Sequence, residues 1–411
     1  MKVWILQTGE PLQIDNNGAR AMRAINLSNS LVDKGHQVTL WSANFDHFTK
    51  KHRYKGSRTI NYNANLQIKL IDSVGYKKNQ GIKRLIDHAQ LACGLHFALK
   101  KMELPDIAFI GYPPIEVAWI MSRFLKKNSI PMVLDVKDMW PDVLLRALPS
   151  QARGVGKLLL SPYYYLMNST FKAATSISSI SQDFLDQSVK IARRAPNVSD
   201  SVNYLTTIRP NYTDTEISNA QKWLDRMGVI DNKQTRCSFV GSLTSVFDWD
   251  CVIEAFKNSN TELVLGGDGP CFQDLKEKTE NIKNIVLLGR ITGIQSKVLA
   301  DRTNVFIAPY KSSLEFSHSL PNKFFDAMEY GKPLLSSVAG SASQFIVKNN
   351  IGLIYSDIPT LKMALNKLEI NPDFFRQLGE NAIDAYDKDF LGQIVYGKII
   401  NNLEKLSKAN D

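Results

Sequence analysis

Short apolar runs alternate along this chain with longer segments whose apolar residues recur at helical spacing, and this alternation restricts the possible folds most. The first cycle comprises a strand at 3–6, a helix over 22–32 that Gly35 ends, and a second strand at 37–41. A connection of this length joins parallel strands, because antiparallel neighbours need only a short hairpin. The pattern therefore predicts an α/β protein built on parallel sheets.

The cycle runs through two halves of the chain, separated by a largely polar stretch. We expect strands at 107–110, 132–135, 176–181 and 206–208 in the first half, and at 237–241, 262–265, 285–290, 305–310 and 334–336 in the second. Since 411 residues exceed one ordinary core, two domains follow. We predict two facing, doubly wound, Rossmann-like domains with a cleft between them. The N-terminal domain would span 1–210 and the C-terminal domain 211–385, and a helical segment over 386–411 would pack back on the first domain.

The composition is that of a soluble globular protein with a basic surface. Hydrophobic residues make up 44% and charged residues 22%, which excludes disorder, collagen and coiled coil. Fifty Lys and Arg against 40 Asp and Glu leave a formal charge of +10, which favours anionic partners such as nucleotides, nucleic acid or acidic lipid. The cysteines lack CxxC spacing, no apolar run approaches the roughly 18 residues of a membrane span, and no signal-peptide core is present. We therefore expect a cytoplasmic location.

Polar loops that follow the first-half strands are candidates for chemistry, because ligands of open α/β sheets bind beyond the carboxyl ends of the strands. The loop at 16–20 has small residues before the first helix, which let backbone N–H groups approach an anion closely, and Arg20 and Arg23 add positive charge. An ordinary turn with a solvated arginine explains it equally well, since GxGxxG is absent. The segment 135–142 holds three carboxylates, Lys137 and Trp140. A surface loop around a buried Trp140 is the alternative there.

The segment 319–328 is the strongest candidate site in the second half. Pro321 at the first helical position and Ser319 near the cap leave backbone N–H groups free. Lys323 and Asp326 are three residues apart and share one helix face. The lysine could then bind a phosphate while the acid binds sugar hydroxyls, which together would hold a nucleotide. A weak surface ion pair, worth under about 1 kcal/mol, is the plainer explanation.

Metal chemistry is not indicated by the pattern of potential ligands. Asp248 and Asp250 form a DxD sequence, but an acid pair at a helix N-terminus explains it better. Six histidines are scattered, and His88 and His96 are too far apart on their helix to chelate one ion. GxSxG and P-loop sequences are absent as well. We expect no metal site.

The chain resembles the bacterial family 4 retaining glycosyltransferases of the GT-B fold, and within them the O-antigen and capsule enzymes of the N-acetylfucosamine-transferase type. The resemblance runs nearly end to end. The matching segments are 6–11, 18–20, 35–38, 135–142 and 208–211 in the first half and 239–242, 267–270, 288–290 and 308–310 in the second. Each is weak alone, but their order and spacing are specific.

This resemblance implies transfer of a sugar from a nucleotide-diphosphate donor, UDP-linked, with retained anomeric configuration and without a metal. Asp138, with Lys137, is then the polar group at the reacting sugar, and Lys323 neutralises charge on the leaving diphosphate. The donor-binding residues implied are Gly18, Arg20, Gly241, Gly267, Arg290, Ser319, Leu320, Pro321, Asn322 and Asp326. The implied acceptor is a glycan linked to a polyprenyl diphosphate or another carrier, in surface-polysaccharide synthesis.

The sequence departs from the family at two places. The family's Glu-x7-Glu pattern reads His318 and Asp326 here, so the first acid has no charged equivalent and the second is one methylene shorter. The Arg and Lys that many relatives carry after the Phe-Val-Gly strand are replaced by the segment 242–247. Phosphate charge would consequently fall on Lys323, Arg20 and backbone amides.

Two other functions and one further partner follow from the sequence. A nucleotide-sugar 2-epimerase on the same fold would use the donor without an acceptor, and a non-enzymatic nucleic-acid binder would need only the basic charge. The second lacks a recognisable RNA or DNA module, so we expect no nucleic-acid partner. An anionic membrane at the inner face of the plasma membrane is the expected partner of the first domain. Basic residues lie beside apolar ones in three segments, at 50–58, 77–95 and 146–165.

Overall fold

The computed structural model of the chain describes residues 1–15, 20–77, 81–146, 148–232, 234–311 and 320–409. The chain divides into two compact units. Unit 1 comprises Met1–Asn17, Ala21–Thr207 and Gly392–Asp411, and unit 2 comprises Gly18–Arg20 and Ile208–Leu391. The boundaries between the two units therefore lie at 207/208 and 391/392, whereas the sequence suggested 210/211 and 385/386.

Unit 1 is built on an eight-stranded sheet with the order β10-β9-β8-β7-β1-β2-β6-β5. Its strands are β1 (Lys2–Leu6), β2 (Gln37–Ala43), β5 (Arg58–Asn61), β6 (Leu66–Ile71), β7 (Ile107–Tyr112), β8 (Met132–Val136), β9 (Ser176–Ser179) and β10 (Ser201–Val202). All neighbours pair in parallel except β5 and β6. Six of the parallel strands follow the order 3-2-1-4-5-6 of a Rossmann fold. A small antiparallel pair, β3 (Phe45–Asp46) and β4 (Lys51–His52), follows β2.

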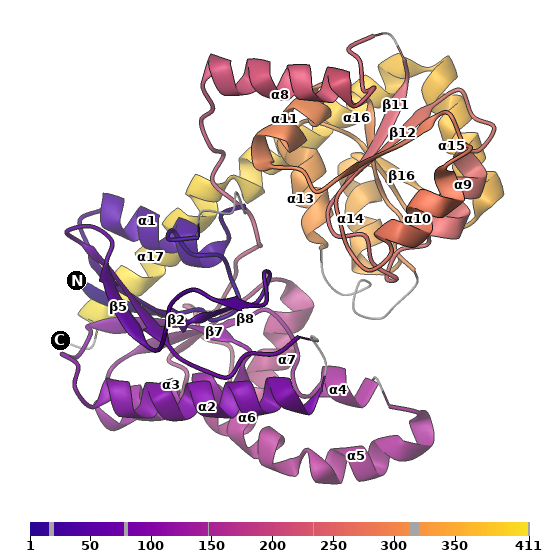
Figure 1. Ribbon diagram of the computed structural model, residues 1–411. Helices are drawn as coiled ribbons and strands as arrows, with labels where there is room; N and C mark the ends of the chain where they lie inside the picture. The colour runs from indigo at the N-terminus through magenta and orange to yellow at the C-terminus, as the bar shows by residue number, and fades with distance from the viewer. Residues whose placement is uncertain (16–19, 78–80, 147, 233, 312–319, 410–411) are drawn as a thin grey trace. The chain divides into compact units, whose positions relative to one another are not determined.

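Helices cover both faces of this sheet. The segments α1 (Arg23–Asp33) and α17 (Gly392–Lys408) pack together, and α2 (Ile82–Leu99), α3 (Ile115–Lys127) and α6 (Ser161–Ala173) form a second packed group (Figure 1). Two short helices, α4 (Asp142–Arg146) and α5 (Arg153–Leu159), precede α6, and α7 (Gln182–Ala192) follows it. The C-terminal helix thus completes the unit that the N-terminus begins.

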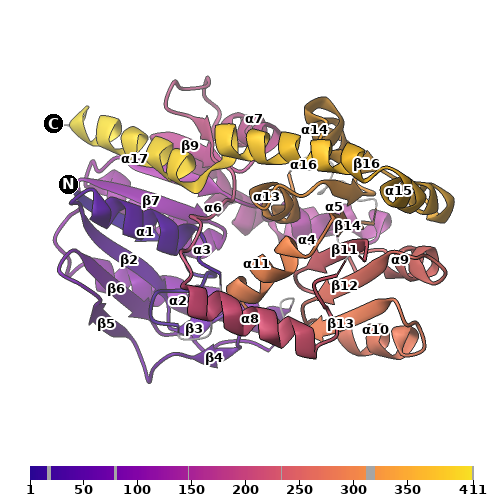
Figure 2. The same ribbon diagram turned by 90° about the horizontal axis from the view of Figure 1, so that it is seen from above.

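Unit 2 repeats the architecture on a six-stranded parallel sheet with the order β13-β12-β11-β14-β15-β16. Its strands are β11 (Arg236–Val240), β12 (Glu262–Gly266), β13 (Ile285–Gly289), β14 (Val305–Ala308), β15 (Leu334–Ser336) and β16 (Gly352–Ile354). Its helices are α8 (Asp214–Arg226), α9 (Trp249–Phe256), α10 (Phe272–Thr279), α11 (Gly293–Asp301), α13 (Asn322–Glu329), α14 (Ser341–Asn349), α15 (Ile358–Ile370) and α16 (Pro372–Ala385). Figure 2 shows α9 and α10 beside one another and α15 beside α16. The predicted α/β class with two Rossmann-like domains is confirmed.

One predicted strand is wrong. Residues 203–210 form no strand, and β10 takes the edge of the sheet instead. The apolar and β-branched character of this stretch serves burial: Thr206 and Thr207 are buried, the Thr207 hydroxyl donates to the carbonyl oxygen of Ala21, and the Tyr396 hydroxyl donates to that of Thr206. These bonds satisfy the backbone groups that a ladder would otherwise pair. Among the residues described, no helix has the length and apolar character needed to cross a membrane.

Candidate functional site

Glycines end three neighbouring strands of unit 2 and bring their backbones into close contact. The amide of Gly241 donates to the carbonyl oxygen of Gly266 at 2.9 Å, and the amide of Gly267 donates to that of Gly289 at 2.7 Å. A Cβ atom on Gly267 would lie 1.8 Å from the carbonyl oxygen of Gly241, and the φ of Gly267 is 158°. Only glycine fits this position, so the sheet ends in a shelf of bare backbone at its carboxyl edge.

Lys323 lies directly against this glycine shelf. Its ammonium group donates to the carbonyl oxygen of Val240 and lies 3.9 Å from the ring centre of Phe239. A Cβ atom on Gly241 would lie 2.1 Å from its Nζ atom, so glycine there leaves the room that the lysine head occupies. Burial, and then repulsion from Arg20, lower the pKa of Lys323 to about 7. An anion at this edge would stabilise the charged ammonium.

Helix α13 begins one residue later than expected. Pro321 occupies the N-cap position with an extended ψ of 145°, and Asn322 is the first helical residue. The fixed φ of proline suits both positions, and proline offers no side-chain cap to the first turn, in which the N–H of Phe324 donates to the carbonyl oxygen of Pro321 at 2.9 Å. Leu320 is partly buried and Asn322 is exposed. Ser319, like Gly18 and His318, lies outside the described residues.

Asp326 on the same helix pairs with Arg20, which belongs to unit 2 by its contacts. Arg20 also lies 3.6 Å from the carboxylate of Glu329, whose pKa is raised by burial. Arg209 reaches Glu329 at 3.9 Å and Asp387 at 3.0 Å. Glu329 and Arg209 were not among the site residues expected from the sequence. Glu329 is nevertheless three residues beyond Asp326 and therefore shares its helix face.

Arg290 follows β13 and is exposed, and it makes no hydrogen bond or ion pair with another residue that the structure describes. Unit 2 thus brings Gly241, Gly267 and Lys323 together at one edge. Asp326 lies one helical turn from Lys323 on α13.

In unit 1, Lys137 belongs to a buried polar cluster around Asp135. Its ammonium pairs with Glu10, donates to the side-chain oxygen of Gln7 at 2.8 Å and lies 3.9 Å from Asp135. The fully buried Arg23 donates to Asp135 at 2.9 Å. Both cations are therefore tied to protein acceptors, which makes Lys137 a positioning group in this geometry. Arg23, which was expected to add charge to the loop at 16–20, is instead buried against Asp135, and Glu10 was not expected as a site residue.

Asp138 is held in one orientation by its own loop. One oxygen accepts the backbone N–H of Met139 at 2.7 Å, and the other accepts the indole N–H of Trp140 at 3.0 Å. The Tyr112 hydroxyl in turn donates to the carbonyl oxygen of Trp140 at 2.5 Å. Trp140 is buried, as one of the two interpretations of this segment expected, and its N–H fixes a partly exposed carboxylate.

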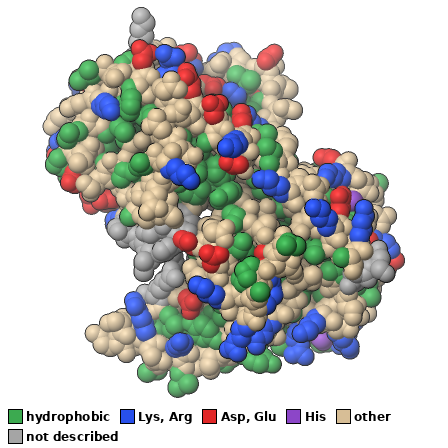
Figure 3. Space-filling model, turned by 180° about the vertical axis from the view of Figure 1, so that it is seen from behind, with side chains coloured by type: hydrophobic (Ala, Val, Ile, Leu, Met, Phe, Trp, Pro, Cys, Tyr) green, Lys and Arg blue, Asp and Glu red, His purple; other side chains and the backbone are tan. Residues whose placement is uncertain are grey.

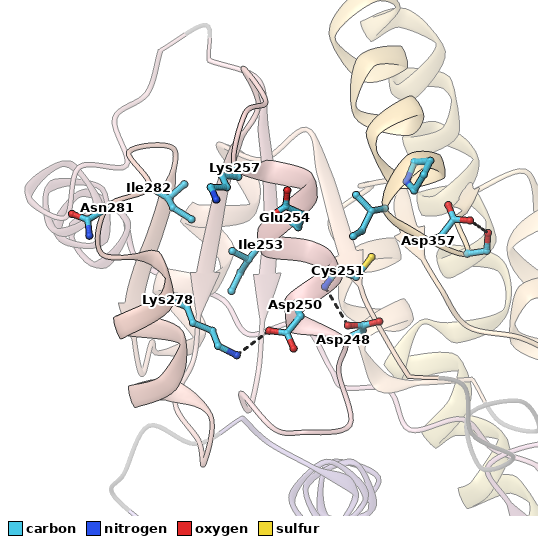
Figure 4. Close-up of a pocket in the computed structure, with 13 residues that line it drawn as sticks. Asp248, Asp250, Cys251, Ile253, Glu254, Lys257, Lys278, Asn281, Ile282 and Asp357 are labelled. Carbon is cyan, nitrogen blue, oxygen red and sulfur yellow. Dashed lines mark hydrogen bonds and ion pairs between the residues drawn. The ribbon is translucent and has the colours of Figure 1, made fainter.

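A groove of about 930 Å³ lies among α9, α10 and the start of α15 (Figure 4). Asp248 caps α9 by accepting the backbone N–H of Cys251 at 3.2 Å, and Asp250 pairs with Lys278 at 2.9 Å. These two acids therefore serve a helix N-terminus and a surface ion pair. Within the part of the chain that the structure describes, no group of three or more His, Cys, Asp or Glu side chains could hold a metal ion.

Most of unit 2 matches a protein-family model. Residues 224–385 match the protein-family model described as "Glycosyl transferases group 1". The matched region contains the glycine shelf and Lys323. No curated protein matches the chain.

Solved structures share the fold over nearly the whole chain. Sucrose-phosphate synthase from Thermosynechococcus elongatus is 12% identical with a TM-score of 0.72, and 99% of each chain is covered. HepE from Anabaena, solved with UDP and glucose, is 13% identical with a TM-score of 0.66, and 98% of this chain and all of that one are covered. WaaG, a glycosyltransferase of lipopolysaccharide biosynthesis, is 15% identical with a TM-score of 0.64, over 98% and 99% of the two chains. Together with the family match, these likenesses support a glycosyltransferase of the GT-B fold.

Proposed function

We propose that the protein transfers a sugar from a nucleotide-diphosphate donor to a glycan acceptor, with retention of the anomeric configuration. The observation that carries this proposal is Lys323, whose ammonium lies against Gly241 on a shelf of bare backbone. Backbone N–H groups and a cation at the carboxyl edge of a parallel sheet are suited to a diphosphate. The match of residues 224–385 to the glycosyltransferase model supports the same assignment.

The donor would be held by unit 2. The diphosphate would lie at the start of α13 and Lys323, the ribose on Asp326, and the base near Arg290. Charge that develops on the leaving diphosphate needs preorganised donors, and the first turn of α13 with Lys323 supplies them. Asp326 is now paired with Arg20, so donor binding requires the carboxylate to exchange that partner for hydroxyl groups. A UDP-linked donor is favoured, since the similar HepE was solved with UDP.

Asp138 in unit 1 is the group that we assign to the reacting sugar. Its carboxylate is oriented by Trp140 and remains partly exposed. Lys137 would keep this loop in place through Glu10 and Gln7 and would not contact the substrate. No metal is required by this arrangement, since the ammonium and backbone amides provide the positive charge.

The acceptor that we propose is a lipid-linked glycan of surface-polysaccharide synthesis, O-antigen or capsule, with unit 1 bound to an anionic membrane. Apolar side chains are exposed on the outer side of α2 and on α5, among them Ile82, Phe97, Leu158 and Leu159, which are 65–75% exposed. Exposed Lys83, Arg153 and Lys157 accompany them. Figure 3 shows blue and green side chains side by side along the lower part of this unit. Basic residues beside exposed apolar ones bind anionic interfaces.

The first basic segment contributes less to such a surface than the sequence suggested. The Arg53 side chain is only 6% exposed and binds Asp15 at 2.6 Å, with further bonds to the carbonyl oxygens of Ala43 and Phe45. Lys50 turns toward Tyr76 at 4.7 Å. The membrane surface that we propose therefore rests on α2 and α5.

Thermal shift with a panel of nucleotide sugars, followed by a transfer assay with lipid-linked glycans, tests the proposal. A donor at 100 times its dissociation constant should stabilise the protein by roughly 2.7 kcal/mol. Asp326→Ala should weaken donor binding and Lys323→Met should lower turnover, whereas Lys348→Met, at an exposed lysine of α14, should change neither. A protein that converts the donor to its epimer without an acceptor would be a nucleotide-sugar 2-epimerase. Absence of stabilisation by every nucleotide sugar would refute both enzymes.

A further inference from the structure

A small cavity of about 130 Å³ opens at the carboxyl edge of the sheet in unit 1. Thr8 and Gly9 follow β1, Ala43 ends β2, and Pro113 and Pro114 follow β7, so three parallel strands end at its wall. This edge is where open α/β sheets bind ligands. The donor site proposed above uses none of these residues, so the cavity has no function yet.

The rest of the wall comes from side chains able to form hydrogen bonds. The Tyr76 hydroxyl lies 2.6 Å from Nδ1 of His47, and Nε of Arg84 lies 3.4 Å from Nε2 of His88. Asp87 completes this group, and Phe45 and Leu91 add apolar surface. A water molecule occupies roughly 30 Å³ in the liquid, so this cavity has room for only a small group. Because its wall is rich in polar side chains, that group should be compact and polar.

One positive charge, that of Arg84, lies in the wall of this cavity, and a second, that of Lys50, lies near the wall residue Tyr76. Nζ of Lys50 lies 4.7 Å from the ring centre of Tyr76, and the guanidinium carbon of Arg84 lies 5.6 Å from the same point. Burial, and then repulsion from Arg84, lower the pKa of Lys50. Burial, and then the charges of Lys50 and Arg84, lower the pKa of His47 to about 4, so this imidazole is neutral near pH 7. Arg84 carries the positive charge of the wall, and Lys50 lies outside the wall beside Tyr76. An anion between them would relieve their repulsion.

Two neighbouring carboxylates, Asp87 in the wall and Asp46 outside it, are held by hydrogen bonds from the protein. Asp87 accepts the backbone N–H of Gly75 at 2.6 Å. Asp46 accepts the backbone N–H of Phe48 at 2.8 Å and the hydroxyl of Thr49 at 2.7 Å. Their oxygens are thus directed at backbone and hydroxyl donors that hold the loops around the cavity.

The backbone of Lys50 adds a second observation. Its φ is 58°, in the left-handed region that a lysine adopts only at an energetic cost. Glycine or asparagine would occupy this position in the turn between β3 and β4 at a lower cost. A strained position that carries a long cation is typical of sites where the side chain is needed.

The cavity also adjoins the group that we assign to the reacting sugar. The guanidinium carbon of Arg84 lies 5.0 Å from the ring centre of Trp140, and the indole N–H of Trp140 binds Asp138. A ligand held by Arg84 would therefore lie within two side chains of Asp138.

From this geometry, and on the basis of the proposed function, we propose that the cavity binds an oxyanion of the acceptor through Arg84, with the nearby Lys50 adding positive charge. The hydrogen-bonded pair of Tyr76 and His47 supplies an additional donor. Two kinds of acceptor provide such a group: a phosphate ester of the lipid carrier, or the carboxylate of an acidic sugar. An acceptor of either kind would be recognised by its charge, and a neutral glycan would bind poorly.

Isothermal titration of the full chain tests this proposal. The protein is first saturated with UDP so that the diphosphate site of unit 2 is occupied. Geranyl phosphate is then compared with geraniol, and methyl glucuronide with methyl glucoside. We expect one charged probe to bind at least tenfold more tightly than its neutral partner, and the pair that responds identifies the source of the oxyanion.

Variants with matched controls locate the binding. Arg84→Gln and Lys50→Gln should each weaken the charged probe about tenfold or more. Lys51→Gln and Lys55→Gln, at exposed neighbours with the same change of charge, should leave it unchanged. Equal binding of charged and neutral probes, or no effect of either cavity variant, would overturn the inference. Failure of UDP itself to bind would instead count against the proposed function, since unit 2 holds that site.

Discussion

Donor binding should take up a proton at Lys323. In the free protein burial holds the pKa of this ammonium at about 7, well below its usual 10.5. A diphosphate beside it favours the charged form, so the pKa in the complex returns toward its ordinary value. UDP-glucose carries no group that titrates between pH 6 and pH 8, so any proton exchanged in this range comes from the protein.

The size of the effect follows from the two protonation states. With a pKa near 7, the free amine is only about one-tenth charged at pH 8 and about nine-tenths charged at pH 6. Binding should therefore take up about 0.9 proton at pH 8 and about 0.1 at pH 6. Because binding takes up a proton, affinity falls as pH rises above 7, and UDP-glucose should bind about tenfold more weakly at pH 8 than at pH 6. Tenfold corresponds to about 1.4 kcal/mol.

Calorimetry in buffers with different enthalpies of ionisation measures this uptake directly. The slope of the observed enthalpy against the buffer enthalpy gives the number of protons. Lys323→Met should abolish both the uptake and the pH dependence of affinity, whereas Lys348→Met should retain both. An uptake near zero at pH 8 in the unmodified protein, or an unchanged uptake in Lys323→Met, would refute the reasoning.

Three further outcomes are expected. Gly267→Ala should lower the melting temperature and weaken UDP binding, because its Cβ would lie 1.8 Å from a backbone oxygen; unchanged values would contradict the tight shelf. Asp135→Asn should reduce the free energy of unfolding in urea by about 3–5 kcal/mol, because it leaves the buried charge of Arg23 without its carboxylate; a loss below about 1 kcal/mol would show that the pair is dispensable. The double variant Leu158→Ser with Leu159→Ser should reduce salt-sensitive co-sedimentation with phosphatidylglycerol vesicles, and equal sedimentation with neutral vesicles would argue against a membrane surface.

Much of the order of strands and helices was predictable, because strands that are buried on both faces of a parallel sheet consist of continuous runs of apolar residues. Runs such as the one that became β7 are buried at every position, and the sequence shows them as unbroken apolar stretches. The strands β5 and β6, which pair with each other antiparallel, were both missed: the residues of β5 are mostly exposed and polar, and β6 alternates buried with partly exposed residues, so neither forms an unbroken apolar run. The stretch at 206–208 was wrongly assigned to a strand because its β-branched residues are typical of strands. In the structure these residues lie in a buried loop, where side-chain hydrogen bonds satisfy the polar groups.

The candidate site was predictable only where function and local sequence coincide. Lys323 and Asp326 lie one helical turn apart, and helical spacing alone relates them. Lys137 could not be separated from a catalytic lysine by sequence, because its partners Gln7 and Glu10 lie some 130 residues away. The same holds for Lys50 and Arg84, which come from different segments and meet only over the ring of Tyr76.

The placement of α17 has a consequence for how this chain is made. The helix packs on α1 and contacts β7, so unit 1 lacks one of its covering helices until α17 is synthesised. The intervening Ile208–Leu391, roughly 180 residues, would take about 10–40 s to emerge at ordinary rates of translation. During that time the N-terminal segment leaves the ribosome first yet stays unfinished, while the inserted unit can already fold. Unit 2 can therefore complete its fold before unit 1, whose folding is completed only when α17 is available.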